Sequence, residues 1–112
     1  MPTDAVFETL ADPRRRRIVE ELRSGEQPVG NLVAVLGIDQ SGVSRHLRIL
    51  HEAGLVKVRP DGQRRLYSLD AKPFKDLDLW ISKYRALWEA RLDRFEGALE
   101  KKQRARSQKT DR

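Results

Sequence analysis

Apolar residues recur every three or four positions through much of the first half of the chain, the spacing of one face of an α-helix. This spacing predicts a short helix capped by Asp4 and a second helix that begins at Asp12, where an aspartate followed by proline is a strong start signal. A third helix is predicted over residues 31–36, and a fourth begins after Asp39; the turn between them contains Gly37. Two short helices joined by such a turn are typical of a helix-turn-helix.

At Leu55 the spacing of apolar residues changes from the three or four positions of a helix to every second position, where valines begin to alternate with basic residues. Together with a Pro-Asp-Gly-Gln turn at 60–63 and a return strand at 64–69, this alternation predicts a β-hairpin. Helical spacing returns at Pro73 and continues to about Lys102. The predicted fold is therefore mainly α, with four short helices, a small hairpin and one long final helix.

The composition restricts the classes of protein to which the chain can belong. Its 112 residues suffice for one small domain. Cysteine is absent, which excludes disulfides, thiolate metal sites and a cysteine nucleophile. The longest apolar run, residues 32–36, is far too short to span a membrane, and the first residues do not resemble a secretion signal. We therefore expect a cytoplasmic protein with no membrane partner.

Positive charge is concentrated in two places. The net charge of the chain is +6. Residues 41–69 carry six basic and two acidic residues, and residues 101–112 carry six basic residues and one acidic residue. Basic segments attract nucleic acid by releasing its counterions, although charge alone is also explained by solubility. For the second segment we favour solubility, because its only apolar residue is Ala105. We predict one domain over residues 1–100 and a disordered basic tail over residues 101–112.

The residues that face outward from the fourth predicted helix carry the chemistry of base recognition. The second helix of a helix-turn-helix enters the DNA major groove, where glutamine can bond to adenine, arginine to guanine, and serine to bases or phosphates. We predict DNA contacts from this helix and from the hairpin tip by Gln40, Ser41, Ser44, Arg45, His46, Arg48, Arg64 and Arg65.

Three other features leave alternatives open. Gly42 either allows close approach to DNA or is a neutral surface glycine. His51 is expected at the surface or in packing, not as a ligand. Arg14 to Arg17 lie near a helix start, where cations oppose the helix dipole, so a phosphate or a partner carboxylate would account for some of them.

The long final helix has an apolar stripe that a small domain cannot cover. It spans about 28 residues, or roughly 42 Å. A two-fold dimer that pairs the first and last helices with their partners would bury the stripe and place two recognition helices about one DNA turn apart. A ligand pocket between aromatic rings is the weaker alternative. The predicted interface consists of Phe7, Leu77, Trp80, Tyr84, Leu87, Trp88, Leu92 and Phe95.

Three segments, residues 10–22, 40–56 and 62–67, resemble the opening helix, recognition helix and wing of the ArsR (arsenical-resistance repressor) family. The resemblance implies a winged helix-turn-helix and a homodimeric bacterial repressor that binds operator DNA, often at its own promoter. Metal-sensing members carry a Cys-Val-Cys thiolate site where this chain has residues 31–36, and residues 71–112 contain no histidine for a zinc site. We therefore predict a metal-independent member without a cofactor.

The leading hypothesis is thus a sequence-specific DNA-binding repressor, with double-stranded operator DNA and a second copy of the chain as partners. The alternative is a non-specific or architectural nucleic-acid-binding protein driven by basic patches. An enzyme is not expected, because the sequence has no glycine-rich phosphate loop and no metal-ligand spacing.

Overall fold

The computed structural model describes residues 3–110, with side chains over residues 3–106. The chain divides into two compact units, and the boundary falls between Asp78 and Leu79. The sequence predicts one domain through residue 100, whereas this boundary lies inside the final helix.

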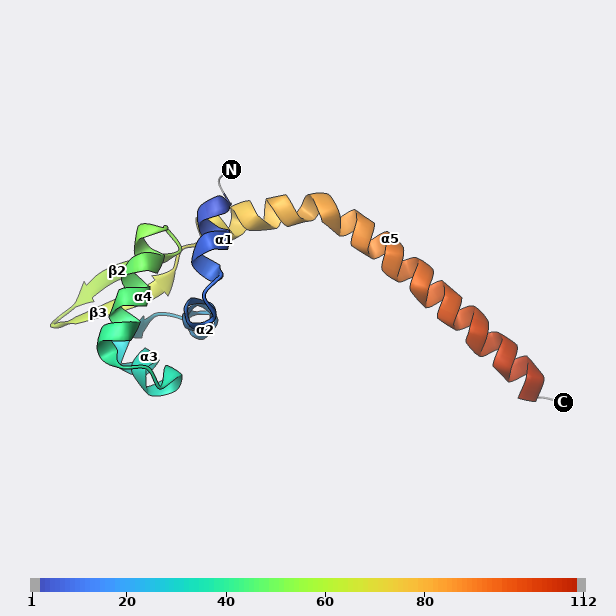
Figure 1. Cartoon of the computed structure of the whole chain (residues 1–112), viewed down its shortest axis with the longest axis horizontal. Coiled ribbons are helices and arrows are strands. Elements are labelled where there is room, and N and C mark those ends of the chain that lie inside the picture. Colours follow the sequence, from blue (N-terminus) through green and yellow to red (C-terminus); the bar gives the residue numbers. More distant parts are fainter. Residues whose placement is uncertain (1–2, 111–112) are drawn as a thin grey trace. The chain divides into compact units, whose positions relative to one another are not determined.

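The first unit contains the four predicted short helices (Figure 1): α1 (Asp4–Leu10), α2 (Pro13–Leu22), α3 (Val29–Leu36) and α4 (Gln40–Glu52). Asp12 caps α2 as predicted, since its carboxylate accepts a hydrogen bond from the Arg14 backbone N–H at 2.8 Å. The cap of α1 was predicted wrongly: Thr3 occupies the cap position and Asp4 is the first helical residue. Gly37 ends α3 in the left-handed conformation, with φ of 66°.

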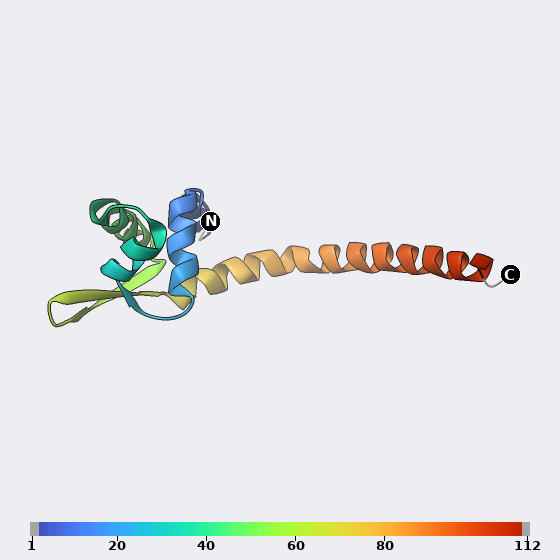
Figure 2. The same ribbon diagram turned by 90° about the horizontal axis from the view of Figure 1, so that it is seen from below.

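A three-stranded antiparallel sheet completes the first unit, formed by β1 (Gln27–Pro28), β2 (Val56–Asp61) and β3 (Arg64–Leu69) in the order β1-β3-β2. The predicted hairpin is present, but Pro60 and Asp61 belong to β2, so the turn is only Gly62 and Gln63. The hairpin tip projects beyond α3 and α4 (Figure 1, Figure 2). The sequence did not predict β1, because two residues are too few to show an alternating pattern.

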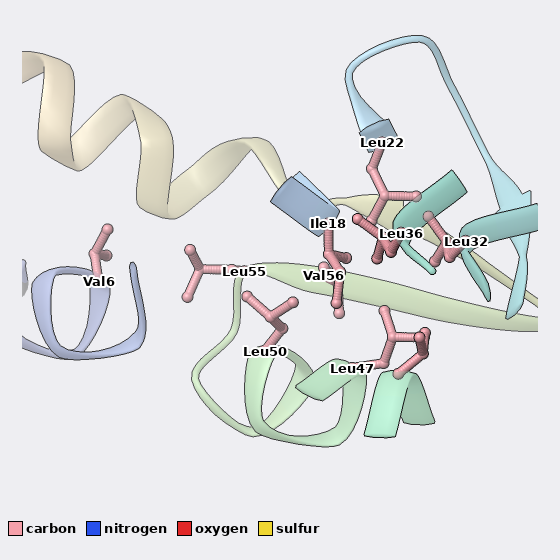
Figure 3. Close-up of a cluster of buried hydrophobic side chains, with 10 residues drawn as sticks. Val6, Ile18, Leu22, Leu32, Leu36, Leu47, Leu50, Leu55 and Val56 are labelled. Carbon is pink, nitrogen blue, oxygen red and sulfur yellow. The ribbon is translucent and has the colours of Figure 1, made fainter. Parts of the chain in front are cut away.

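One apolar core holds the helices of the first unit against the sheet (Figure 3). Burying a leucine or valine side chain contributes about 1.5–3 kcal/mol, so this cluster determines which face of each element points inward. Phe74 and Leu77, from the start of the final helix, also pack against it. Leu77 thus contacts its own unit, although the sequence predicts it at a dimer interface. The fully buried members include Ile18, Leu32, Val43, Leu47, Leu50 and Leu55.

The arginines at the start of α2 join α1 to α2. Arg15 Nε donates to the Thr9 carbonyl at 2.7 Å, and Arg16 Nη1 donates to the Leu10 and Ala11 carbonyls at 2.7 and 3.1 Å. Arg14 pairs with the capping Asp12. The last carbonyls of a helix lack intrahelical partners, and cations near them are favourable. Contacts within the chain therefore explain three of the four arginines without a phosphate or a partner carboxylate.

The final helix, α5 (Ala71–Thr110), begins in the first unit and forms the second. Asp70 accepts a hydrogen bond from the Lys72 N–H at 3.1 Å, so the helix begins before the predicted Pro73. It also continues to Thr110, whereas the sequence predicts a disordered tail from residue 101. Lysine, glutamine and arginine in this segment all favour helix, and Glu100, just before it, lies four residues before Arg104, a stabilising spacing.

The second unit exposes most of the apolar stripe of α5. Tyr84, Leu87, Trp88, Leu92 and Phe95 are all exposed, while Trp80 is half-buried and its ring lies 5.1 Å from that of Tyr84. Over residues 3–110, no helix has both the length and the apolar character needed to cross a membrane.

Candidate nucleic-acid interface

A groove of about 1100 Å³ lies in the first unit between the outward face of α4, the start of α3 and the hairpin. Side chains of α3, α4 and the hairpin line it together. They include seven of the eight residues for which the sequence predicts DNA contacts: Gln40, Ser41, Ser44, Arg45, Arg48, Arg64 and Arg65.

The amphipathic pattern of α4 creates its share of this groove. Val43, Leu47 and Leu50 are completely buried, and their burial turns the opposite face of the helix outward. Ser44, Arg45 and the other groove residues of α4 are exposed on that outward face. The Ser41 hydroxyl donates to the Asp39 carboxylate, so it is already engaged at the start of the helix.

His46 is the predicted DNA contact that the structure contradicts. Its side chain is only 2% exposed, because position 46 follows Val43 by three residues and precedes Leu50 by four, on the inward face. Its Nδ1 has no hydrogen-bond partner in the described part of the chain. His46 therefore lies on the buried face of α4 and does not line the groove.

The surroundings of His46 also affect its protonation. Burial lowers the pKa of the imidazole below its usual 6.5, and nearby Arg14, Arg15 and Arg45 lower it further. The Asp12 carboxylate acts in the opposite direction and raises this pKa. Burial is the largest of these effects, so the neutral form is favoured.

Ion pairs divide the arginines of α4 and the hairpin into two groups. Arg64 donates to Asp61 at 2.9 Å, and Arg59 binds Glu26, a contact that raises the pKa of Arg59. Within residues 3–106, Arg45, Arg48 and Arg65 make no ion pair. The uncompensated positive charge of the groove therefore comes from these three side chains.

Eight residues that the sequence did not predict as DNA contacts also line the groove, among them the apolar Pro28, Val29 and Val58. Gly30 and Asn31 come from the start of α3, and His51 comes from the end of α4. Gln63 lies in the hairpin turn, and Tyr67 lines the groove while it packs against the core. Gln63 adjoins Arg64 and could have been inferred from the hairpin. The position of Asn31 in the groove could not have been inferred from the sequence. The pairing of β1 with β3, which the sequence did not predict, brings the start of α3 beside the sheet.

Gly42 has a different role from either interpretation of the sequence. A Cβ atom at this position would lie 2.8 Å from Asp39 Oδ1 and 2.9 Å from Ile38 Cγ2. Both distances are too short for a real contact. The missing side chain makes room for the side chains of Ile38 and Asp39 at the turn between α3 and α4.

The described residues do not assemble a recognisable metal site. Across the part of the chain that the structure describes, no three histidine, cysteine, aspartate or glutamate side chains come together as ligands. The chemistry of the groove is instead that of amides, hydroxyls and guanidinium groups, which suits hydrogen bonding to phosphates and base edges.

Comparison with known proteins identifies relatives of this arrangement. A sequence model of the bacterial regulatory proteins of the arsR family matches residues 12–58, from the cap of α2 into β2. The HTH-type transcriptional regulator Rv2034 of Mycobacterium tuberculosis is 46% identical over 67 residues, which are 60% of this chain and 63% of Rv2034. The chain thus matches less than two thirds of the length of that relative. The transcriptional repressor SdpR of Bacillus subtilis is 32% identical over 76 residues, 68% of this chain and 84% of SdpR.

A solved structure shares the fold of the chain. It is the homodimeric winged helix-turn-helix DNA-binding domain of Mb0332 from Mycobacterium bovis, described as a possible ArsR-family transcriptional regulator. The match has a TM-score of 0.62 and 26% identity, and it covers 74% of this chain and 80% of that domain. The four short helices and the hairpin therefore form a winged helix-turn-helix, in which the hairpin is the wing.

Proposed function

The chain belongs to the arsR family of bacterial regulatory proteins, and on this premise we propose that it is a sequence-specific repressor that binds a palindromic operator as a homodimer. Its relatives are named as transcriptional regulators and repressors, which are not enzymes. Since bacterial operator DNA lies in the cytoplasm, the proposal implies that the protein acts there.

The single observation that supports this proposal best is the set of arginines without ion pairs in the groove. Arg45 and Arg48 lie on α4 and Arg65 lies on the wing. Guanidinium groups without ion pairs therefore line the groove on both its α4 side and its wing side. A recognition helix presents its first turns to base edges in the major groove, and arginine can bond bidentately to guanine. We assign base contacts to Gln40, Ser44, Arg45 and Arg48, and a phosphate or minor-groove contact to Arg65.

The homodimer is proposed from the apolar stripe of the second unit. Tyr84, Trp88 and Phe95 lie along α5 at helical spacing and remain exposed in a single chain. A contiguous exposed apolar patch indicates an interaction surface, and a two-fold pair would bury it. Mb0332, a solved relative, is described as homodimeric. Because the chain has no cysteine, the repressor would act without a thiolate metal-sensing site.

Arg45→Ala tests the base contact. If Arg45 contacts a base, the substitution should cost about 1–3 kcal/mol of binding free energy and relax the preference at one base pair. Fluorescence anisotropy with DNA from immediately upstream of the gene, and with single-base variants of it, measures both effects. Lys57→Ala is the matched control: it removes the same charge from an exposed residue of β2 that does not line the groove.

The competing function predicts a different pattern. A non-specific or architectural protein would bind all DNA sequences with equal affinity and would lose most of its affinity when residues 101–112 are deleted. Equal affinity of the wild-type chain for operator and scrambled DNA would therefore contradict the proposal.

A further inference from the structure

An ion pair between residues far apart in sequence joins the wing to the segment between α2 and β1. The carboxylate of Glu26 accepts three hydrogen bonds from Arg59: Nε at 3.0 Å and 2.8 Å, and Nη2 at 2.7 Å. The two residues are 33 positions apart in sequence. Both oxygens of the carboxylate are engaged, and a bidentate pair of this kind fixes orientation as well as distance.

Local structure holds Glu26 in place on its own side. Gly25 precedes it with φ of 127°, a backbone conformation that favours glycine and turns the chain away from α2. The next residue, Gln27, donates from Nε2 to the Glu21 carbonyl of α2 at 2.7 Å and pairs with Tyr67 of β3. The residue after Glu26 is thus held by both α2 and the sheet, which restrains the backbone at Glu26.

Arg59 lies on the less supported strand of the wing. In the sheet order β1-β3-β2, β2 is an edge strand with β3 as its neighbour. Only its first residue, Val56, is buried, and the residues from Lys57 to Pro60 are exposed. The ion pair of Arg59 with Glu26 therefore connects the exposed part of β2 to the segment that follows α2.

We propose that the Glu26–Arg59 pair sets the approach of the wing to DNA, which makes Glu26 a positioning residue for the contact of Arg65. This inference rests on the proposed DNA-binding function. Arg59 and Arg65 occupy adjacent strands, and Arg65 pairs in register with Pro60, the residue after Arg59. An orientation imposed on Arg59 is transmitted through the hairpin to Arg65.

Two effects of removing Glu26 have opposite signs, so they can be separated. If the carboxylate acted only through its charge, its loss would strengthen binding to the DNA polyanion. If it positions the wing, its loss weakens binding. Exposed ion pairs are worth up to about 1 kcal/mol, so Glu26→Ala should lower operator affinity by roughly two- to fivefold.

A double-mutant cycle with Glu26→Ala and Arg65→Ala tests the proposal, with operator affinity measured in the full-length chain. We expect each substitution to lower affinity, and Glu26→Ala to have little further effect once Arg65 is removed. Glu20→Ala is the matched control, because Glu20 is exposed on α2 and makes no ion pair within the described residues. It should leave affinity unchanged or slightly raise it.

Glu26→Asp gives a second measurement that keeps the charge and the fold. Shortening the side chain should disturb the bidentate geometry and lower affinity by less than Glu26→Ala does. Wild-type or raised affinity in both Glu26 variants, while Arg65→Ala weakens binding, would overturn the positioning role and leave the proposed function intact. If Arg65→Ala has no effect, the wing contact itself fails, and the positioning role fails with it.

Discussion

Single residues of α4 have different environments according to the face on which they lie. Arg45 is exposed to the groove, while the next residue, His46, is buried against the core. Adjacent positions on a helix are about 100° apart, which is enough to separate them completely. The buried imidazole is also the residue through which pH should act on the fold.

We predict that the stability of the protein falls as the pH drops below about 6.5, and that His46 contributes to this fall. The folded state lowers the pKa of His46, so in acid the unfolded chain binds a proton that the folded chain resists. The contribution of His46 to stability is fully present above the pKa of this histidine in the unfolded chain. It is lost as the pH decreases toward the lower pKa of the same histidine in the folded chain.

Urea unfolding followed by circular dichroism at pH 7.5 and pH 5.5 measures the effect. His46→Gln should reduce the difference between the two conditions, whereas His51→Gln, which removes an exposed histidine, should preserve it. The same pH difference in wild type and His46→Gln would contradict the prediction.

At the scale of elements, the corner between α1 and α2 depends on side chains that bridge the two helices. Arg15 is partly buried, with a side chain 16% exposed, and it contacts both the Thr9 carbonyl and the Asp12 carboxylate. A hydrogen bond from a charged group to an otherwise unsatisfied carbonyl is stronger than a neutral one. The same carboxylate caps α2, and its hydrogen bonds with Arg14 lower the pKa of Asp12 to about 2.

Arg15→Ala should therefore lower the free energy of unfolding by about 1–2 kcal/mol. Arg17→Ala is the control, because Arg17 is exposed and makes no ion pair in the described part of the chain; it should change stability by less than about 0.5 kcal/mol. Chemical denaturation at pH 7.5 measures both variants. Equal stability of the two would mean that the corner does not depend on Arg15.

For the whole molecule, the proposed homodimer depends on the exposed apolar stripe of α5. Trp88 is 65% exposed in the single chain. A tryptophan side chain buries about 150–250 Å² when covered, so covering the exposed part of Trp88 contributes roughly 3 kcal/mol per copy.

We predict that Trp88→Glu converts the homodimer into monomers and greatly weakens operator binding, because a carboxylate cannot be buried without a partner. Analytical ultracentrifugation measures the oligomeric state. Ala90→Glu introduces the same charge two positions away, on the opposite face of the helix, and should leave the dimer unchanged. A Trp88→Glu variant that still sediments as a dimer would exclude this stripe as the interface.

Much of the architecture was predictable because it depends on neighbouring residues. Caps, turns and apolar spacing act over four residues or fewer, so the helices, the hairpin and the outward face of α4 follow from local patterns. Local patterns placed five of the predicted contacts on the outward face of α4 and two on the hairpin, and tertiary packing brought these seven into one groove. The start of α5 carried a local signal at Asp70 that was missed, and the helical segment from residue 101 was obscured by its high charge.

Local sequence patterns were enough to predict the five helices, the hairpin and the chemistry of the outward side chains of α4, since each depends on backbone propensity and short-range spacing. The packed structure was needed to show which arginines form ion pairs, that β1 pairs with β3, and that Glu26 contacts the wing. These features depend on residues distant in sequence, such as Glu26 and Arg59, whose proximity exists only after the core has formed.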